Sequence, residues 1–163
     1  MSIGRYEVIF DPDAIAATPF AQVGELFSYM NPTYGYQIYR YCQYNGAMAT
    51  LLQGLGTTYL VTSSFVVAEG VANTPKANTG GVCQRAAGIP DLFYGFLLVW
   101  GRGLVVTDAA VLVDTPALLT TATGLGRFDD TAVATLEHCI LGQFKEAAVA
   151  AAALVACEIR ILG

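Results

Sequence analysis

The chain has 163 residues, of which 55% are hydrophobic and 13% are charged, with a net charge of −5 and a mean hydropathy of +0.51. Globular proteins carry about 25% charged residues, so we expect exposed apolar patches that become interfaces in an oligomer or a permanent complex. The acidic balance and the scattering of the eight Lys and Arg residues exclude the basic patch that nucleic-acid-binding proteins need to neutralise phosphates.

Transmembrane helices are not predicted, because they need about 20 consecutive apolar residues. The longest apolar run, residues 147–157, lies between Glu146 and Glu158, and the run 104–113 is interrupted by Asp108. The N-terminus lacks the basic and then apolar pattern of a secretory signal. We therefore expect one soluble β-rich domain over residues 1–163, made in the cytoplasm and free of contact with membranes.

The first residues are predicted to contain a strand and a helical turn. Residues 5–10 alternate like a strand, and residues 11–13 follow as a turn. Asp13 is a candidate N-cap for a short helical turn over residues 14–16. Residues 1–23 are also a candidate N-terminal arm.

A hairpin is predicted next. Residues 25–30 and 36–44 fit two strands, and the Asn-Pro-Thr-Tyr-Gly sequence over residues 31–35 fits the turn between them. Alternation along the second strand separates two faces. One face carries Tyr36, Ile38, Arg40, Cys42 and Tyr44, and the other carries Gln37, Tyr39, Tyr41 and Gln43.

The remaining chain predicts short strands separated by loops. Expected strands cover residues 58–67, 82–87, 93–100, 104–107, 111–113 and 136–144, followed by a final strand from about Leu154. An exposed, mobile loop is expected over residues 72–81 and another loop over 120–130, while 47–56 and 147–152 each fit a short helical segment or a loop. This pattern predicts an all-β fold, a small barrel or sandwich of short antiparallel strands with at most one or two short helices.

The segment 92–100 is the most apolar strand of the chain and contains its single tryptophan, Trp100. No residue that is charged at neutral pH lies between Asp91 and Arg102, so both faces of this strand need apolar cover. We expect a central strand with Trp100 in the core, where truncation of a tryptophan to alanine costs about 3–5 kcal/mol.

Catalytic and metal-binding patterns are missing from the sequence. Cys42, Cys83, Cys139 and Cys157 lack the short spacings of metal sites, so four reduced and mostly buried thiols are expected. His138 is the single histidine, and no Gly-x-Ser-x-Gly motif supplies a nucleophile beside it. We predict no catalytic, cofactor-binding or metal-ligating residue, and no enzyme.

Three other patterns have both a structural and a functional interpretation. The Gly-x-Gly pairs at 101–103 and 124–126 do not complete a dinucleotide motif and fit turns that need positive φ. The Asp11/Asp13 and Asp129/Asp130 pairs lack the spacing of calcium ligands and fit solvated turns. The tyrosines could form a stacking platform for sugars or single-stranded nucleic acid, but without basic neighbours they favour core and interface packing. They are Tyr34, Tyr36, Tyr39, Tyr41 and Tyr44.

Three pairs of segments, in order along the chain, carry a family resemblance. They are residues 18–24 with the Gly35-Tyr-Gln-Ile-Tyr-Arg-Tyr41 strand, residues 82–88 with Tyr94-Gly-Phe-Leu-Leu-Val-Trp-Gly101, and Ile140-Leu-Gly142 with Glu158-Ile-Arg-Ile-Leu-Gly163. Together they resemble the small β-structured capsid decoration proteins, also called cement or head-stabilising proteins, of tailed bacteriophages and prophages.

The resemblance implies a non-enzymatic virion protein that binds the outer surface of a phage capsid lattice and stabilises it. Its partners would be the major capsid protein and further copies of itself, in a homo-oligomer such as a trimer, without cofactors, nucleic acid or membrane. It would be made in the host cytoplasm and reside on the capsid surface of the virion. Two alternatives stay open: another virion component, such as a tail-tube, connector or fibre-associated β-domain, and a small-ligand-binding β-barrel with tyrosines at its mouth.

Overall fold

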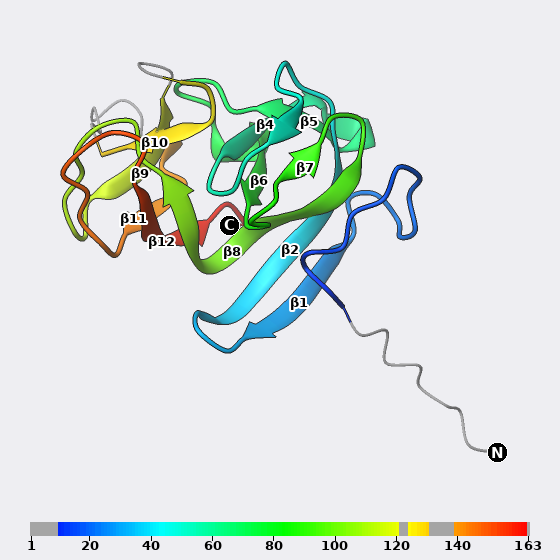
Figure 1. Ribbon diagram of the computed structural model, residues 1–163, viewed down its shortest axis with the longest axis horizontal. Coiled ribbons are helices and arrows are strands. Elements are labelled where there is room, and N and C mark those ends of the chain that lie inside the picture. Colours follow the sequence, from blue (N-terminus) through cyan, green and yellow to red (C-terminus); the bar gives the residue numbers. More distant parts are fainter. Residues whose placement is uncertain (1–9, 121–123, 131–138, 163) are drawn as a thin grey trace.

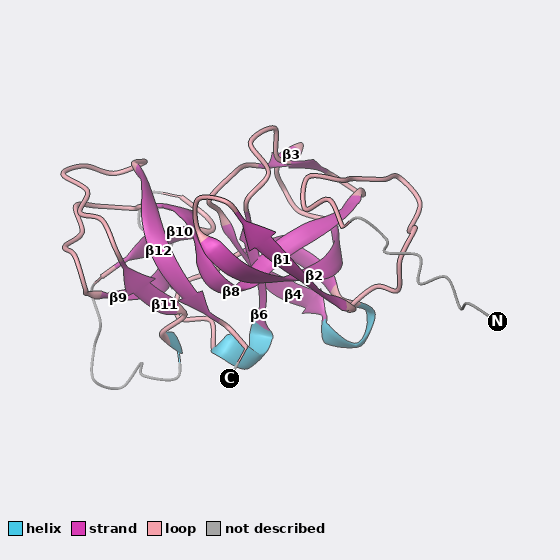
Figure 2. Ribbon diagram, turned by 90° about the horizontal axis from the view of Figure 1, so that it is seen from below, coloured by secondary structure: helices cyan, strands magenta, loops and turns pink. Residues whose placement is uncertain are grey.

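The computed structural model describes residues 10–120, 124–130 and 139–162 (Figure 1). Strands dominate these residues, so the predicted all-β class is confirmed (Figure 2). Neither of the named helical turns in the described part is long and apolar enough to span a bilayer. The strands are β1 (Leu26–Asn31), β2 (Gly35–Tyr44), β3 (Thr50–Leu51), β4 (Gly56–Val61), β5 (Val66–Glu69), β6 (Thr79–Cys83), β7 (Ile89–Pro90), β8 (Tyr94–Val106), β9 (Pro116–Thr120), β10 (Arg127–Asp129), β11 (Gly142–Phe144) and β12 (Leu154–Arg160), and the 3₁₀ turns are η1 (Thr62–Ser64) and η2 (Lys76–Asn78).

Five strands close into a small barrel. β2 pairs with β5, β5 with β4, β4 with β6 and β6 with β8, and β8 returns to pair with β2. The β2–β5 pair is parallel and the other pairs of this ring are antiparallel. Closure leaves these strands without long free edges. The predicted hairpin is confirmed, because β1 pairs with the first half of β2 in antiparallel register.

β8 continues from the barrel into a second sheet. From Trp100 to Val106 it pairs with β12, and the order continues through β11 and β9 to β10. The predicted break between two strands at residues 101–103 is therefore wrong. Gly101 adopts a φ of +105°, and a Cβ atom there would lie 2.6 Å from the carbonyl oxygen of Tyr36. Glycine thus lets the strand pass close to β2 without ending.

Three glycines connect the barrel with the second sheet through a closed triangle of main-chain hydrogen bonds. The Gly56 amide donates to Gly126 at 2.7 Å, Gly126 donates to Gly70 at 2.8 Å, and Gly70 donates to Gly56 at 2.8 Å. The side chains of Leu119 and Phe128 fill the space beside Gly56, where a Cβ would meet them at 2.7 and 2.8 Å. The start of β4, the end of β5 and the approach to β10 are therefore held together.

Buried side chains form two clusters that follow the alternation predicted for β2. Tyr39 and Tyr41 belong to the larger cluster, together with Phe96, Phe128 and others of β8 to β12. Cys42 and Tyr44 belong to the smaller one, which gathers side chains from β2, β5, β6 and β8. The predicted assignment of these four residues to two faces is confirmed.

Two strand predictions fail because the chain turns where the pattern looked continuous. Residues 58–67 form β4, the turn η1 and the start of β5, since Phe65 adopts a φ of +52° and reverses the chain into a hairpin. Residues 111–113 do not form a strand beyond a bridge from Val111 to Ala148. The carboxylate of Asp130 accepts hydrogen bonds from the Leu112 amide and the Thr115 hydroxyl, both at 3.1 Å, and this holds a turn.

The loop predicted over residues 72–81 is wrong at its C-terminal end, because Thr79, Gly80 and Gly81 are buried in β6. A Cβ on Gly80 would lie 2.5 Å from the Val67 side chain, so β6 can pack against β5 here only because residue 80 has no side chain. β6 ends at Cys83, short of the predicted 87. Beyond Cys83, the side-chain amide of Gln84 makes the hydrogen bonds to β8 that a further main-chain pair would make. It donates to the main-chain carbonyl of Leu104 at 2.9 Å and accepts from the main-chain amide of Leu104 at 2.8 Å.

The C-terminal predictions hold in part. β12 starts at Leu154 as expected, and residues 147–152 are a loop in which Ala152 adopts a φ of +60°. Residues 47–55 also form a loop, with the short β3 inside it, and Gly56 already begins β4. Within the expected loop 120–130, residues 127–129 form β10 by pairing with β9. In the described part of the expected strand 136–144, only residues 142–144 form a strand, β11, because residues 139–141 are not in strand conformation. Residues 136–138 lie outside the described residues.

Residues 10–23 pack against the domain. The Phe10 ring lies 5.2 Å from that of Phe27 and 4.7 Å from that of Phe96. The helical turn expected at 14–16 does not form, because Ala16 is extended and exchanges main-chain hydrogen bonds with Tyr94. Asp13 is not a cap, and its amide instead donates to the Asp11 carboxylate at 2.9 Å. The strand expected at residues 5–9 lies outside the described residues.

Candidate interaction surface

The outer face of the β1–β2 hairpin is an apolar surface. Leu26 and Met30 are 47% and 68% exposed, whereas Phe27 and Tyr29 between them turn toward the core. The antiparallel register places Leu26 opposite Arg40 and Met30 opposite Tyr36, which is itself 48% exposed. Side chains alternate along a strand, so these four residues share one face.

Trp100 joins this outer face and is only partly buried. Its ring meets that of Tyr36 edge-on at 5.9 Å, and its main chain lies opposite Ile38 and Arg160. The expectation that Trp100 lies in the core is therefore wrong.

A β-bulge causes this outward position. Ile38 lies opposite Trp100 and Tyr39 opposite Leu98, so Val99 is the extra residue. Such an insertion shifts the alternation of side chains by one position. Leu98 and Val99 consequently enter the same core cluster, and Trp100 points outward. A sequence pattern of continuous apolar residues carries no signal for this shift.

Arg40 anchors one end of the face to the barrel. Its Nη1 donates a hydrogen bond to the Tyr59 hydroxyl, and its guanidinium lies 5.9 Å from the centre of the Phe65 ring. The Nε atom is buried and has no hydrogen-bond partner among the described residues. The hydroxyl and the aromatic face hold the charged group, so this end is a fixed part of the surface.

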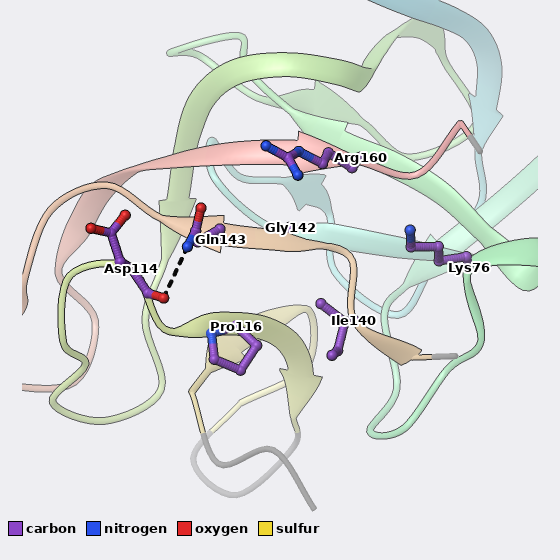
Figure 3. A pocket seen from close by; sticks show the side chains of 7 residues that line it. All are labelled: Lys76, Asp114, Pro116, Ile140, Gly142, Gln143 and Arg160. Carbon is purple, nitrogen blue, oxygen red and sulfur yellow. Dashed lines mark hydrogen bonds between the residues drawn. The ribbon is translucent and has the colours of Figure 1, made fainter. Parts of the chain in front are cut away.

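A separate cleft of about 490 Å³ lies over β9, β11 and β12 (Figure 3). Asp114 lies at the left of the cleft in Figure 3. Its carboxylate forms an ion pair with Lys145 Nζ at 2.9 Å, and its main-chain carbonyl accepts a hydrogen bond from the side-chain amide of Gln143 at 3.0 Å. Lys76 and Arg160 add positive charge, which suits an anionic group. The described lining pairs no nucleophile with a base. It consists of Lys76, Asp114, Pro116, Ile140, Gly142, Gln143 and Arg160.

The cysteines that the sequence singled out are free and buried, as predicted. Burial raises the pKa of the Cys42, Cys83 and Cys157 thiols to about 12. Among the described residues, no group of three His, Cys, Asp or Glu side chains converges as a metal site would require. His138 lies outside the described residues.

The glycine and aspartate pairs shape the backbone. Gly126 has a φ of +74° beside a turn, as expected, but the Gly101 pair lies inside β8 and not at a turn. Asp11 and Asp130 accept hydrogen bonds from nearby amides. The Asp129 carboxylate accepts one from the Asp130 amide at 2.7 Å.

The tyrosines of β2 divide between the core and the surface. Tyr39, Tyr41 and Tyr44 are at most 2% exposed, whereas Tyr36 lies on the apolar face. Core packing explains the burial of the first three, and Tyr39 also borders, together with Tyr34, a cleft of about 200 Å³. The apolar face itself was missed by sequence reasoning, although Leu26 and Met30 at alternate positions of a predicted strand were a usable signal.

Comparison with solved structures finds a likeness in fold, whereas comparison by sequence finds none. No protein-family model matches the chain, and no curated protein matches it. The chain is similar to the crystal structure of the head fiber gp8.5 N base of bacteriophage phi29, with a TM-score of 0.54 and 12% sequence identity over 76% of this chain and 95% of that chain. The two chains share a fold.

Proposed function

We propose that this chain is a non-enzymatic structural protein of a tailed-phage virion that binds the outer surface of the capsid and stabilises it. The observation that carries the proposal is the shared fold with a protein whose name places it in a fibre of a phage head, over 95% of that protein's chain. The order of the decoration-protein segments in the sequence supports the same placement.

The exposed apolar face gives this function a physical basis. Leu26, Met30, Tyr36 and Trp100 form a surface that a partner can cover, and burial of apolar area contributes about 25 cal/mol per Å². A single contact of this size is modest. If copies of this chain are joined in an oligomer, the oligomer can engage several sites of the repeating lattice at once and so bind more tightly than one copy does. The major capsid protein is the proposed partner.

A fibre-associated domain is the second candidate, and the same likeness favours it. The two functions differ in where the copies lie. A decoration protein covers the capsid lattice at many equivalent positions, whereas a fibre component occupies the positions where fibres attach. Cryo-electron microscopy of the parent particle, compared with particles that lack this gene, would show which set of positions carries the extra density.

Capsid binding is tested with expanded capsids that lack this protein. We expect the purified chain to sediment with them and to raise the temperature at which they break open. The variant Trp100→Ala should fold but bind at least about tenfold more weakly, since it removes a large aromatic anchor. Leu112→Ala is the control, because Leu112 is 67% exposed and lies away from this face in a turn near β9. A chain that ignores expanded capsids contradicts the proposal.

A further inference from the structure

The outer edge of β1 carries main-chain groups that face no described strand, because β1 is the first strand in the sheet order (Figure 1). The Tyr41 amide donates to the carbonyl of Glu25 at 3.0 Å, so residue 25 points its main chain toward β2. Main-chain groups alternate between the two sides of an antiparallel strand. Leu26, Ser28 and Met30 therefore direct their amides and carbonyls outward.

This edge lacks the features that keep natural sheet edges apart, which are charged side chains, prolines and bulges. Between residues 26 and 44 the only charged residue is Arg40, so all 13 Asp and Glu residues of the chain lie elsewhere. Two copies with a net charge of −5 repel one another over most of their surface. The hairpin is where they can approach without bringing carboxylates together.

We propose that two copies of this chain pair antiparallel through their β1 edges, around a two-fold axis at Ser28. In this register Ser28 lies opposite Ser28 of the partner subunit, and Leu26 lies opposite Met30 of the partner subunit. Every outward main-chain group of the three residues then finds a partner, and each exposed apolar side chain meets another. The edge is thus complementary to itself, as a two-fold contact requires.

The pair would also join the apolar faces of two copies. Leu26, Met30 and Tyr36 lie on one side of the hairpin, so extending the sheet across β1 places both faces next to each other. This gives a dimer in place of the trimer that the family resemblance implies. The inference stands independently of the proposed capsid binding, because the purified chain alone tests it.

Cysteine cross-linking tests the register. Residues directly opposite in a hydrogen-bonded antiparallel pair have Cα atoms about 5.5 Å apart, which suits a disulfide. We expect Ser28→Cys to form a covalent dimer under mild oxidation. Leu26→Cys and Met30→Cys should each form no covalent dimer alone and should cross-link when mixed. The four native cysteines are buried and give little background.

Thr33→Cys, at an exposed position in the hairpin turn, is the control and should not cross-link. In a second measurement, Ser28→Lys should weaken self-association at least about tenfold while the monomer stays folded, since it places like charges across the axis. The inference is overturned if Ser28→Cys forms no covalent dimer, if Thr33→Cys cross-links equally well, or if Ser28→Cys couples to capsid protein and not to itself.

Discussion

The Tyr44 hydroxyl donates a hydrogen bond to the carboxylate of Glu69, and both side chains are buried in the barrel. The same carboxylate accepts hydrogen bonds from the amides of Met48 at 2.6 Å and Ala47 at 3.1 Å. One buried charge at the end of β5 thus holds the loop that follows β2.

Replacing Glu69 with glutamine should lower the free energy of unfolding by about 2–4 kcal/mol, because three donors lose a charged acceptor in a buried site. Tyr44→Phe removes one donor and should cost about 1.5–3 kcal/mol. Urea unfolding measures both losses, and the double variant shows whether the two residues are coupled. Glu25→Gln, at an exposed position, is the control and should change stability little. Equal effects of Glu25→Gln and Glu69→Gln would contradict this network.

The same carboxylate makes stability depend on pH. Burial alone raises the pKa of Glu69, but the hydrogen bonds from Tyr44, Met48 and Ala47 outweigh it and hold the pKa below the ordinary value of 4.5. Because the pKa is lower in the folded state, the contribution of Glu69 is fully present above pH 4.5 and is lost as the pH falls through the folded value. Unfolding free energies measured across this range should fall less steeply for Glu69→Gln than for the natural chain.

The glycine triangle predicts a loss of stability from one added methyl group. Gly126→Ala forces a side chain onto a φ of +74°, with its Cβ 2.7 Å from the Gly56 carbonyl oxygen. Gly35→Ala, the control, has a φ of +77° and nothing within 4 Å of the added Cβ. We expect about 1–2 kcal/mol for Gly35→Ala from the backbone conformation alone, and a clearly larger loss for Gly126→Ala. Equal losses in thermal unfolding would mean that the triangle tolerates crowding.

Local pattern was sufficient for much of this fold. Alternation predicted the β1–β2 hairpin and the two faces of β2, and the turn residues at 31–35 predicted the hairpin loop. It was not sufficient where distant residues decide the structure. Gly101 continues a strand because β2 passes within 2.6 Å of its position, and no local property of Gly-Arg-Gly distinguishes that from a turn.

The candidate surface was predictable only in kind. Low charge content predicted exposed apolar patches, and these exist on β1 and β2. Their position depends on which edge of the sheet stays unpaired and on the bulge at Val99, and both follow from pairing between segments about 60 residues apart in the chain. The placement of Trp100 on this surface followed from the same pairing.

Trp100 and Phe96 should therefore respond differently to truncation. Phe96 is 2% exposed and contacts several aromatic rings, so Phe96→Ala should cost about 3–5 kcal/mol. Trp100→Ala should cost about 1–2 kcal/mol, because the side chain is partly in water before the change. Chemical denaturation of the two variants measures both values. A loss from Trp100→Ala as large as that from Phe96→Ala would place the tryptophan in the core.

The buried thiols predict a protein that resists thiol reagents while folded. Burial raises the pKa of Cys42, Cys83 and Cys157 to about 12, so at pH 8 only about one thiol in ten thousand is a thiolate, the reactive form. Burial also raises the pKa of Cys139. Labelling with a chromogenic disulfide reagent should be slow in buffer and should reach all four cysteines in denaturant. Thr33→Cys supplies an exposed thiol for comparison and should react at once, and a native cysteine that reacts as fast would show that its surroundings open in the folded protein.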